Sequence, residues 1–309
     1  MTARGPRVPS DRIRLGCMVT MAAVALSFLL GAAIAKRDEP PFAEGRLWRI
    51  SKAGIDNSYV FGTIHLPDPR VTAIPGEVKA ALAQSRTLAT EVVIGAVDGA
   101  QARELEALVE HGKLEPIVGA VTFRALSEKL AAQGMLPDVI AHLKPWAAMM
   151  KITREASDRT SETLDEQIVL DARARRMRVW SLEGIEEQVA SFDTIPAESQ
   201  VALLEYAVAL PDALAADLEP TIQAWQAGDL AALAQVSARV GERYPPMSRH
   251  VRELANHIIR DRTSVMHYRL FMPLREGRVF VAVGAMHLYG GEGLLALLEQ
   301  DGYRVTRVM

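Results

Sequence analysis

Two histidines with matching local sequence are the residues of this chain best suited to chemistry. His65 ends Val60-Phe-Gly-Thr-Ile-His65 and His287 ends Ala282-Val-Gly-Ala-Met-His287, so each follows a glycine by three residues and an apolar β-rich run. Neutral imidazole is the commonest side-chain ligand of transition metals. If the two strand ends meet in space, the histidines can hold one metal ion together. The alternative is two separate hydrogen-bonded histidines at strand ends.

Glu91 is the third candidate, because it lies within the otherwise apolar run 87–94. A buried carboxylate without a partner is strongly unfavourable. A metal ion beside the two imidazoles would supply a partner, and nitrogen and oxygen donors together suit divalent ions. A buried arginine would supply one equally well. The sequence leaves both interpretations open.

A predicted late helix over 248–270 carries a polar group near its apolar positions. Arg260 is a candidate for stabilising developing negative charge, and Asp261 is a candidate metal ligand because His257 lies one helical turn before it. A solvated helix face is the alternative for this group. Glu183, which follows the predicted strand over 177–182, is a candidate for the rim of the same site or for a solvent-exposed helix start.

Other motifs add little. Gln188 shares the two interpretations given for Glu183. The glycine-rich turn over 289–293 precedes a predicted helix and can present backbone amides to an anion. Its resemblance to a dinucleotide fingerprint fails, because the preceding strand ends too early and no ribose-binding acid can follow. No zincin, serine-hydrolase or P-loop motif occurs, and the remaining histidines lack partners at ligand spacing.

The first 35 residues are predicted to be an export signal. A leader with four arginines precedes the weakly polar to apolar run 15–35, which ends in the small-x-small pattern Ala33-Ile-Ala35. The run is also long enough for an uncleaved anchor that holds the protein at the inner membrane. Localisation is therefore predicted to be periplasmic or extracellular. The single cysteine, Cys17, lies in this segment, so any metal site in the mature chain must use nitrogen and oxygen.

Charge excludes one class of partner. Without the leader, which holds four of the 35 basic and one of the 38 acidic residues, the chain carries 31 basic against 37 acidic side chains. An acidic chain without basic blocks is not expected to bind nucleic acid. Oligomeric state is not determined by these features. Membrane contact is expected only through the N-terminal segment, if it is retained.

Hydrophobic periodicity predicts strands near both ends of the chain and helices between them. The expected strands are 47–51, 58–61, 87–94, 177–182, 278–283 and 303–308. The expected helices are 75–84, 101–111, 123–133, 145–157, 164–176, 196–209, 212–226, 229–240, 248–270 and 294–300. The fold class is therefore α/β, with a central mixed β-sheet flanked by helices and a large helical insert, over about 99–176 and 196–275. The domain is predicted over 46–309, after an extended linker over 36–45.

These motifs together resemble the TraB/PrgY/GumN family, to which the TIKI metalloproteases are related. The matching stretches are 59–65 (YVFGTIH), 87–91 (TLATE), 180–188 (WSLEGIEEQ), the Arg260 helix, 280–288 (FVAVGAMHL) and 302–308 (GYRVTRV). The resemblance implies a fold akin to the erythromycin-esterase and ChaN-like group. It also implies a site made of His65, Glu91 and His287. The family's usual Arg-Asn pair corresponds here to Arg260-Asp261, so the role of Asp261 is open.

The resemblance implies divalent-metal-dependent peptide hydrolysis, with manganese or cobalt as the cofactor of TIKI-like enzymes, and the cofactor predicted for this chain is a divalent ion: manganese, cobalt or zinc. The leading hypothesis is an exported metal-dependent hydrolase, a peptidase, in which His65 and His287 bind the ion. Glu91 is the third ligand or the general base, and Arg260 or the turn over 289–293 stabilises negative charge. The substrate would be a peptide or a small molecule. The rival hypothesis is a non-enzymatic envelope protein that binds a metal ion or a haem-like ligand.

Overall fold

The computed structural model describes residues 40–92, 113–153 and 162–309. The predicted leader, the start of the linker and the helix expected over 101–111 lie outside these residues. The ends of the expected strand 87–94 and of the expected helix 145–157 also lie outside them. Within the described ranges, no helix is both long and apolar enough to cross a membrane.

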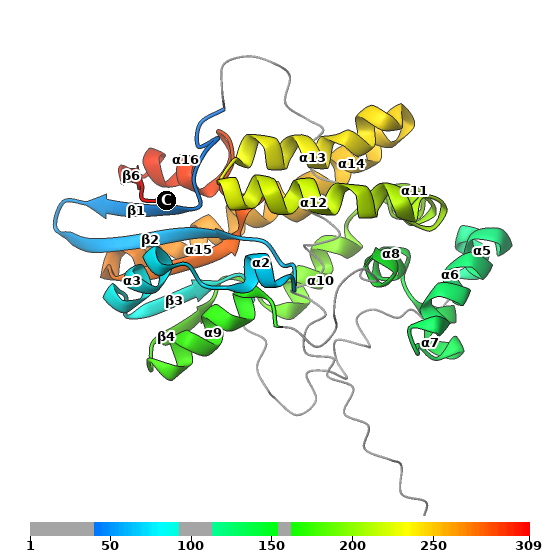
Figure 1. Ribbon diagram of the computed structural model, residues 1–309, viewed down its shortest axis with the longest axis horizontal. Helices are drawn as coiled ribbons and strands as arrows, with labels where there is room; N and C mark the ends of the chain where they lie inside the picture. Colours follow the sequence, from blue (N-terminus) through cyan, green and yellow to red (C-terminus); the bar gives the residue numbers. More distant parts are fainter. Residues whose placement is uncertain (1–39, 93–112, 154–161) are drawn as a thin grey trace, which may run out of the picture.

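The described residues form a mixed β-sheet with helices on both of its faces (Figure 1), which confirms the predicted α/β fold class. The strands are β1 (Leu47–Lys52), β2 (Ile55–Thr63), β3 (Thr87–Thr90), β4 (Arg178–Ser181), β5 (Val279–Gly284) and β6 (Arg304–Arg307). Their order across the sheet is β4-β3-β5-β2-β1-β6. Strands β4, β3, β5 and β2 are parallel to one another, whereas β1 is antiparallel to both β2 and β6. The carboxyl ends of four strands therefore meet at one edge of the sheet.

Strand β5 occupies the centre because nearly all of its residues, VFVAVG, are apolar and buried. Such a continuous apolar run is typical of a parallel strand covered on both faces. Strand β2 lies directly beside it, with Thr63 opposite Gly284. The two glycine–histidine motifs therefore leave adjacent strands at nearly the same level, although about 220 residues separate them in sequence.

The helices fall into an earlier and a later group along the chain. The earlier helices are α2 (Pro69–Thr72), α3 (Gly76–Gln84), α5 (Glu115–Val118), α6 (Ala120–Ala132), α7 (Pro137–His142), α8 (Pro145–Thr153), α9 (Leu164–Ala174) and α10 (Ile185–Asp193). The later helices are α11 (Ala197–Ala209), α12 (Pro211–Ala227), α13 (Leu230–Arg243), α14 (Ser248–Ala255) and α15 (Arg262–Glu276), with α16 (Leu294–Gln300) near the end. Short turns of other helix types are η2 (Pro245–Met247), η3 (Asn256–Asp261) and η4 (Ala285–His287).

Two hydrophobic cores organise these elements. The first joins the sheet to α3, α9, α12, α15 and α16, and includes the edge-to-face pair Phe61–Trp225. The second lies among α6, α8, α11 and α14, where Trp146 stacks on Phe192. Figure 1 shows these helices beside the carboxyl edge of the sheet. The edge that carries the motif residues therefore faces the helical part of the molecule.

The expected helix over 248–270 differs from the observed one in a way that affects the site. It begins as α14, passes through a single π-helical segment, η3, and continues as α15 to Glu276. A π-helical turn contains an extra residue, so it changes which side chains of the following helix face inward. Such turns are frequent at functional sites.

Candidate functional site

The four parallel strands each deliver a polar residue to the same edge of the sheet. His65 follows β2, Glu91 follows β3, Glu183 follows β4 and His287 ends η4 after β5. All four side chains are nearly inaccessible to solvent, with exposed fractions of 2–3%. We call them, together with Asp165, Arg262 and Thr263, the histidine–carboxylate cluster.

Helix α9 orients His65 through a buried carboxylate. Its start is fixed by a capping box in which Thr163 and Glu166 exchange hydrogen bonds. This start brings Asp165 to the sheet, where its Oδ2 lies 2.8 Å from His65 Nδ1 and its Oδ1 accepts a 2.6 Å hydrogen bond from Thr63. The Asp165 carboxylate accepts a hydrogen bond from the Nδ1–H group, so the other ring nitrogen, Nε2, points away from it toward Glu91.

Helix α15 orients His287 in a similar way. The hydroxyl of Thr263 donates to the carbonyl of Ile259 at 2.7 Å and lies 2.8 Å from His287 Nδ1. Because the hydroxyl hydrogen is already used, Nδ1 of His287 donates to Thr263. The Nε2 atom of His287 therefore carries the lone pair, which also faces Glu91.

Glu91 lies between the two imidazoles and is bound on both of its oxygens. Its Oε1 is 3.8 Å from Nε2 of each histidine and accepts a 2.6 Å hydrogen bond from the backbone N–H of Gly284. Its Oε2 accepts a 2.7 Å hydrogen bond from Arg262. The buried arginine that the sequence left open as a partner of Glu91 is therefore present.

Arg262 is a fully buried guanidinium that pairs with two carboxylates. It donates to Glu91 and, from Nε and Nη2, to Glu183 at 2.9 and 2.7 Å. A further hydrogen bond reaches the carbonyl of Ile258. Glu91, Glu183 and Asp165 together bring three carboxylates against the guanidinium of Arg262, and they outnumber the positive charges even when His65 is protonated, so the cluster favours a cation.

Burial and neighbouring charges separate the proton affinities of the two histidines. Burial acts against a charge on His65, but Asp165 and Glu91 outweigh it and raise its pKa to about 8. Burial lowers the pKa of His287 to about 4, because Glu91 offsets only part of the desolvation. At neutral pH and without a ligand, His65 is therefore protonated and His287 is neutral.

The carboxylates of the cluster also differ. Burial disfavours the charge on Glu91, but Arg262 and the two histidines outweigh burial and hold its pKa well below its usual range. Burial raises the pKa of Glu183, although Arg262 opposes the change. Glu91 is therefore ionised but a weak base.

The glycines of the two motifs, Gly62 and Gly284, are required for different structural reasons. A Cβ on Gly62 would lie 3.1 Å from the backbone of Ala285 and 3.1 Å from Leu288, so this glycine allows η4 to pack closely on β2. A Cβ on Gly284 would lie 3.2 Å from Glu91 Oε1 and 3.5 Å from both His65 Nε2 and a ring carbon of His287. Gly284 therefore leaves space at the point where the three side chains meet.

Arg260 and Asp261 do not join the histidine–carboxylate cluster. Arg260 is exposed and pairs with Glu292 at 2.9 Å, while Asp261 is exposed and lies 3.5 Å from His257. Both residues end the π-helical segment, and the face that turns inward begins with the next residue, Arg262. The arginine that reaches Glu91 is thus Arg262, two positions after the arginine that was singled out from the sequence for charge stabilisation.

The other rim candidates have definite places. Glu183 belongs to the cluster, and Gln188 is buried at 2% exposure. In the glycine-rich turn, the N–H of Gly290 donates to the carbonyl of Pro41 and the N–H of Gly293 donates to Gly290. These two amides are already used within the backbone, so the turn offers neither of them to a reacting oxygen.

Asp165, Arg262 and Thr263 were not singled out by sequence reasoning, although two of them carry a signal. Arg262 interrupts an apolar stripe at four-residue spacing, formed by Leu254, Ile258, Met266 and Leu270. Asp165 similarly starts the buried face of α9. A charged residue within an apolar stripe needs a buried partner, and that requirement indicates both residues.

The donors can be compared with what a metal ion requires. No ready-made metal-binding group of three or more histidine, cysteine or acidic side chains occurs in the described part of the chain. The nearest arrangement is His65, Glu91 and His287, whose 3.8 Å spacings compare with about 3.4 Å between two donors of a tetrahedral ion at about 2.1 Å. Nε2 of His65 is buried without a hydrogen-bond partner. These donors fit a divalent ion in type and direction, provided that the ion displaces the Nε2 proton of His65, and such an ion would share Glu91 with Arg262 and Gly284.

The fold and the cluster define an α/β protein with paired histidines and a carboxylate at the carboxyl edge of its sheet. The chain belongs to the TraB/PrgY/gumN family, whose model matches residues 46–307. No curated protein and no solved structure matches the chain significantly. Family membership therefore rests on that match, which covers nearly all of the described fold.

Proposed function

We propose that this chain is a divalent-metal-dependent hydrolase that acts on peptides. The observation that carries the proposal is the convergence of two Nε2 atoms on one oxygen of Glu91, with Nε2 of His65 lacking any hydrogen-bond partner. His65, His287 and Glu91 would hold the ion. When bound, a manganese, cobalt or zinc ion supplies Lewis-acid chemistry, polarising a carbonyl and acidifying water.

The surrounding residues support this assignment by their own chemistry. Glu91 has a depressed pKa and is bound by Arg262, which favours a ligand role over a general-base role. Arg262 holds Glu91 in place, and Asp165 and Thr263 fix the two ring orientations. Partners of this kind around a metal ligand commonly set its orientation and basicity.

Removal and return of the metal tests the proposal on the wild-type chain. The purified protein is stripped with a chelator and incubated with a peptide library, alone and after addition of manganese, cobalt or zinc. We expect cleavage only in the presence of an ion, with tight uptake measured by calorimetry. Uptake at the histidine pair with no cleavage of any peptide would reject the hydrolase.

The second candidate function is a non-enzymatic binder of a metal ion or a haem-like ligand. It is favoured by the burial of the cluster, since His65 and His287 are each only 2% exposed. Catalysis requires a coordination position open to substrate, whereas storage or sensing does not. Ion uptake without turnover is the result that this candidate predicts.

We also propose that the protein is exported. The proposal rests on the basic leader and the apolar run 15–35 that ends at Ala35. N-terminal sequencing of the protein recovered from the cell envelope is expected to begin at Lys36. An intact leader in the membrane fraction would instead indicate an anchor, and a cytoplasmic protein with an intact leader would contradict export.

A further inference from the structure

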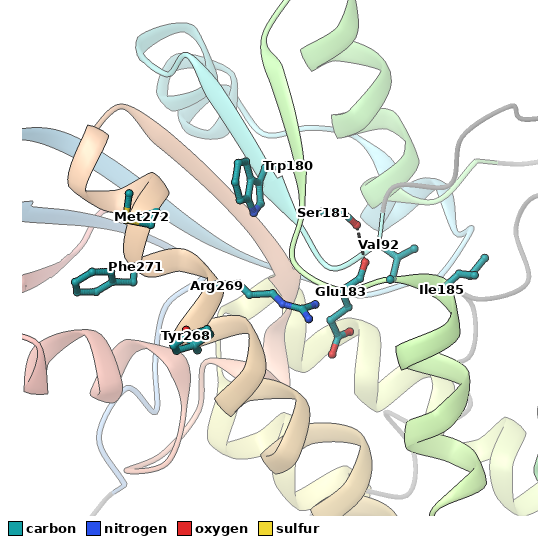
Figure 2. A pocket seen from close by; sticks show the side chains of 10 residues that line it. Val92, Trp180, Ser181, Glu183, Ile185, Tyr268, Arg269, Phe271 and Met272 are labelled. Carbon is teal, nitrogen blue, oxygen red and sulfur yellow. Dashed lines mark hydrogen bonds between the residues drawn. The ribbon is translucent and has the colours of Figure 1, made fainter.

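A cavity of about 770 Å³ lies beside the cluster, between β4, the start of α10 and α15 (Figure 2). Its lining residues are Val92, Trp180, Ser181, Glu183, Gly184, Ile185, Tyr268, Arg269, Phe271 and Met272. Figure 2 shows Tyr268, Phe271 and Met272 projecting from one helix, with Val92 and Ile185 across from it. The volume is within the usual range of about 300–1,000 Å³ for small-ligand sites.

The cavity is lined mainly by apolar side chains, and three of the large ones are exposed to solvent. Tyr268, Phe271 and Met272 are exposed to 81%, 54% and 59%. Aromatic and methionine side chains provide adaptable contact area for another apolar group. Apolar side chains gathered at one place on a surface commonly mark an interaction site.

Both charged side chains that line the cavity already have a partner of opposite charge. Arg269 donates to both oxygens of Glu187 at 2.6 Å and to the carbonyl of Leu182 at 2.7 Å. Glu183 is paired with Arg262. An incoming charged side chain would therefore lose its hydration without gaining an unpaired counter-charge, whereas an uncharged side chain gains from burial.

The cavity adjoins the histidine–carboxylate cluster through one shared residue. Glu183 lines the cavity while its carboxylate binds the same guanidinium as Glu91. Val92, another lining residue, directly follows Glu91. A molecule bound in the cavity therefore contacts Glu183, and only the Arg262 guanidinium separates that carboxylate from Glu91.

We propose that this cavity binds a bulky uncharged side chain of the substrate, aromatic or long aliphatic, and so sets the specificity of the site. The inference rests on the function proposed above. The substrate class is thus a peptide with such a residue near the bond that is cut. Three observations favour such a side chain: the lining is apolar, the charged lining residues already have partners, and the cavity adjoins the cluster.

The test uses the full chain, the variant Phe271→Ser and the control Val265→Ser. Phe271 is exposed, so its replacement is expected to leave the fold intact. Val265 is also exposed and lies on the same helix, but it does not line the cavity. Peptides that differ only in one residue, phenylalanine or aspartate, are compared as substrates. We expect the wild type and Val265→Ser to prefer phenylalanine at least about tenfold in kcat/KM, and Phe271→Ser to lose that preference through KM.

A binding measurement separates this inference from the proposed function. N-acetyl-phenylalanine amide is titrated into each protein and followed by NMR, with N-acetyl-aspartate amide as the comparison. Selective binding of the phenylalanine probe that Phe271→Ser abolishes supports the cavity even if no peptide is cleaved. Cleavage without side-chain preference overturns the cavity and leaves the hydrolase intact. A wild-type dimer that Phe271→Ser converts to a monomer, seen by light scattering, would reassign the surface to a second copy of the chain and overturn the inference.

Discussion

Replacing Arg262 by methionine is expected to lower the free energy of unfolding by about 3–5 kcal/mol, the usual cost of removing one member of a buried charge group. Methionine keeps much of the volume but leaves Glu91 and Glu183 buried without their shared guanidinium. Urea denaturation followed by circular dichroism measures the change. Because Glu91 also loses the group that holds its second oxygen, metal affinity is expected to fall as well.

Arg260→Met is the matched control, since it makes the same substitution two residues earlier in the same helical region. Arg260 is 59% exposed and its pair with Glu292 lies at the surface. Exposed pairs contribute about 0–1 kcal/mol, so little change is expected. If Arg260→Met lowered the free energy of unfolding as much as Arg262→Met, the placement of Arg262 as the buried arginine of the cluster would be contradicted.

Replacing His65 by asparagine is expected to weaken divalent-ion binding at least about 100-fold, beyond the typical loss for a partner that merely orients a ligand. Asparagine retains an N–H that can donate to Asp165, so the buried carboxylate keeps a partner. It removes the Nε2 atom, which is the proposed ligand. Isothermal titration with manganese, cobalt and zinc measures the loss, and peptide cleavage is expected to disappear with it.

His267→Asn is the control for this experiment. The side chain of His267 is more exposed than that of His65, and it pairs with Asp301 at 2.8 Å, outside the cluster. Ion binding by this variant is expected to equal that of the wild type. If His65→Asn binds ions as tightly as His267→Asn, the metal site is elsewhere or absent, and the proposed function is rejected.

The sheet was predictable because hydrophobic pattern determines where strands lie. The apolar runs before His65 and His287 indicated two strands, and each ends close to its predicted boundary. The matching context of His65 and His287 further suggested that these strands are neighbours, which their parallel pairing confirms. Glu91 was also singled out, since a carboxylate in an apolar run needs a partner, although it was expected within the strand and β3 ends one residue before it.

The apolar stripes indicate that Arg262 and Asp165 need buried partners, but they do not specify which residues those partners are. A regular helix through 248–270 gives no reason to place an extra residue in η3, and that residue determines which arginine faces inward. Asp165 reaches His65 across 100 positions of sequence, through the packing of α9 on the sheet. Partners separated by such distances are set by tertiary packing and not by local propensity.

The neighbouring positions of β2 and β5 have a consequence for biosynthesis. When the helices before β5 have emerged from the ribosome, His65 and Glu91 have emerged as well. Strand β5, which must insert between β2 and β3, is then still inside the ribosome. Pairings between segments so far apart in the sequence are slow to form, because a long loop must close first. The histidine–carboxylate cluster is therefore expected to assemble only late in folding, when the final segment enters the gap between β2 and β3.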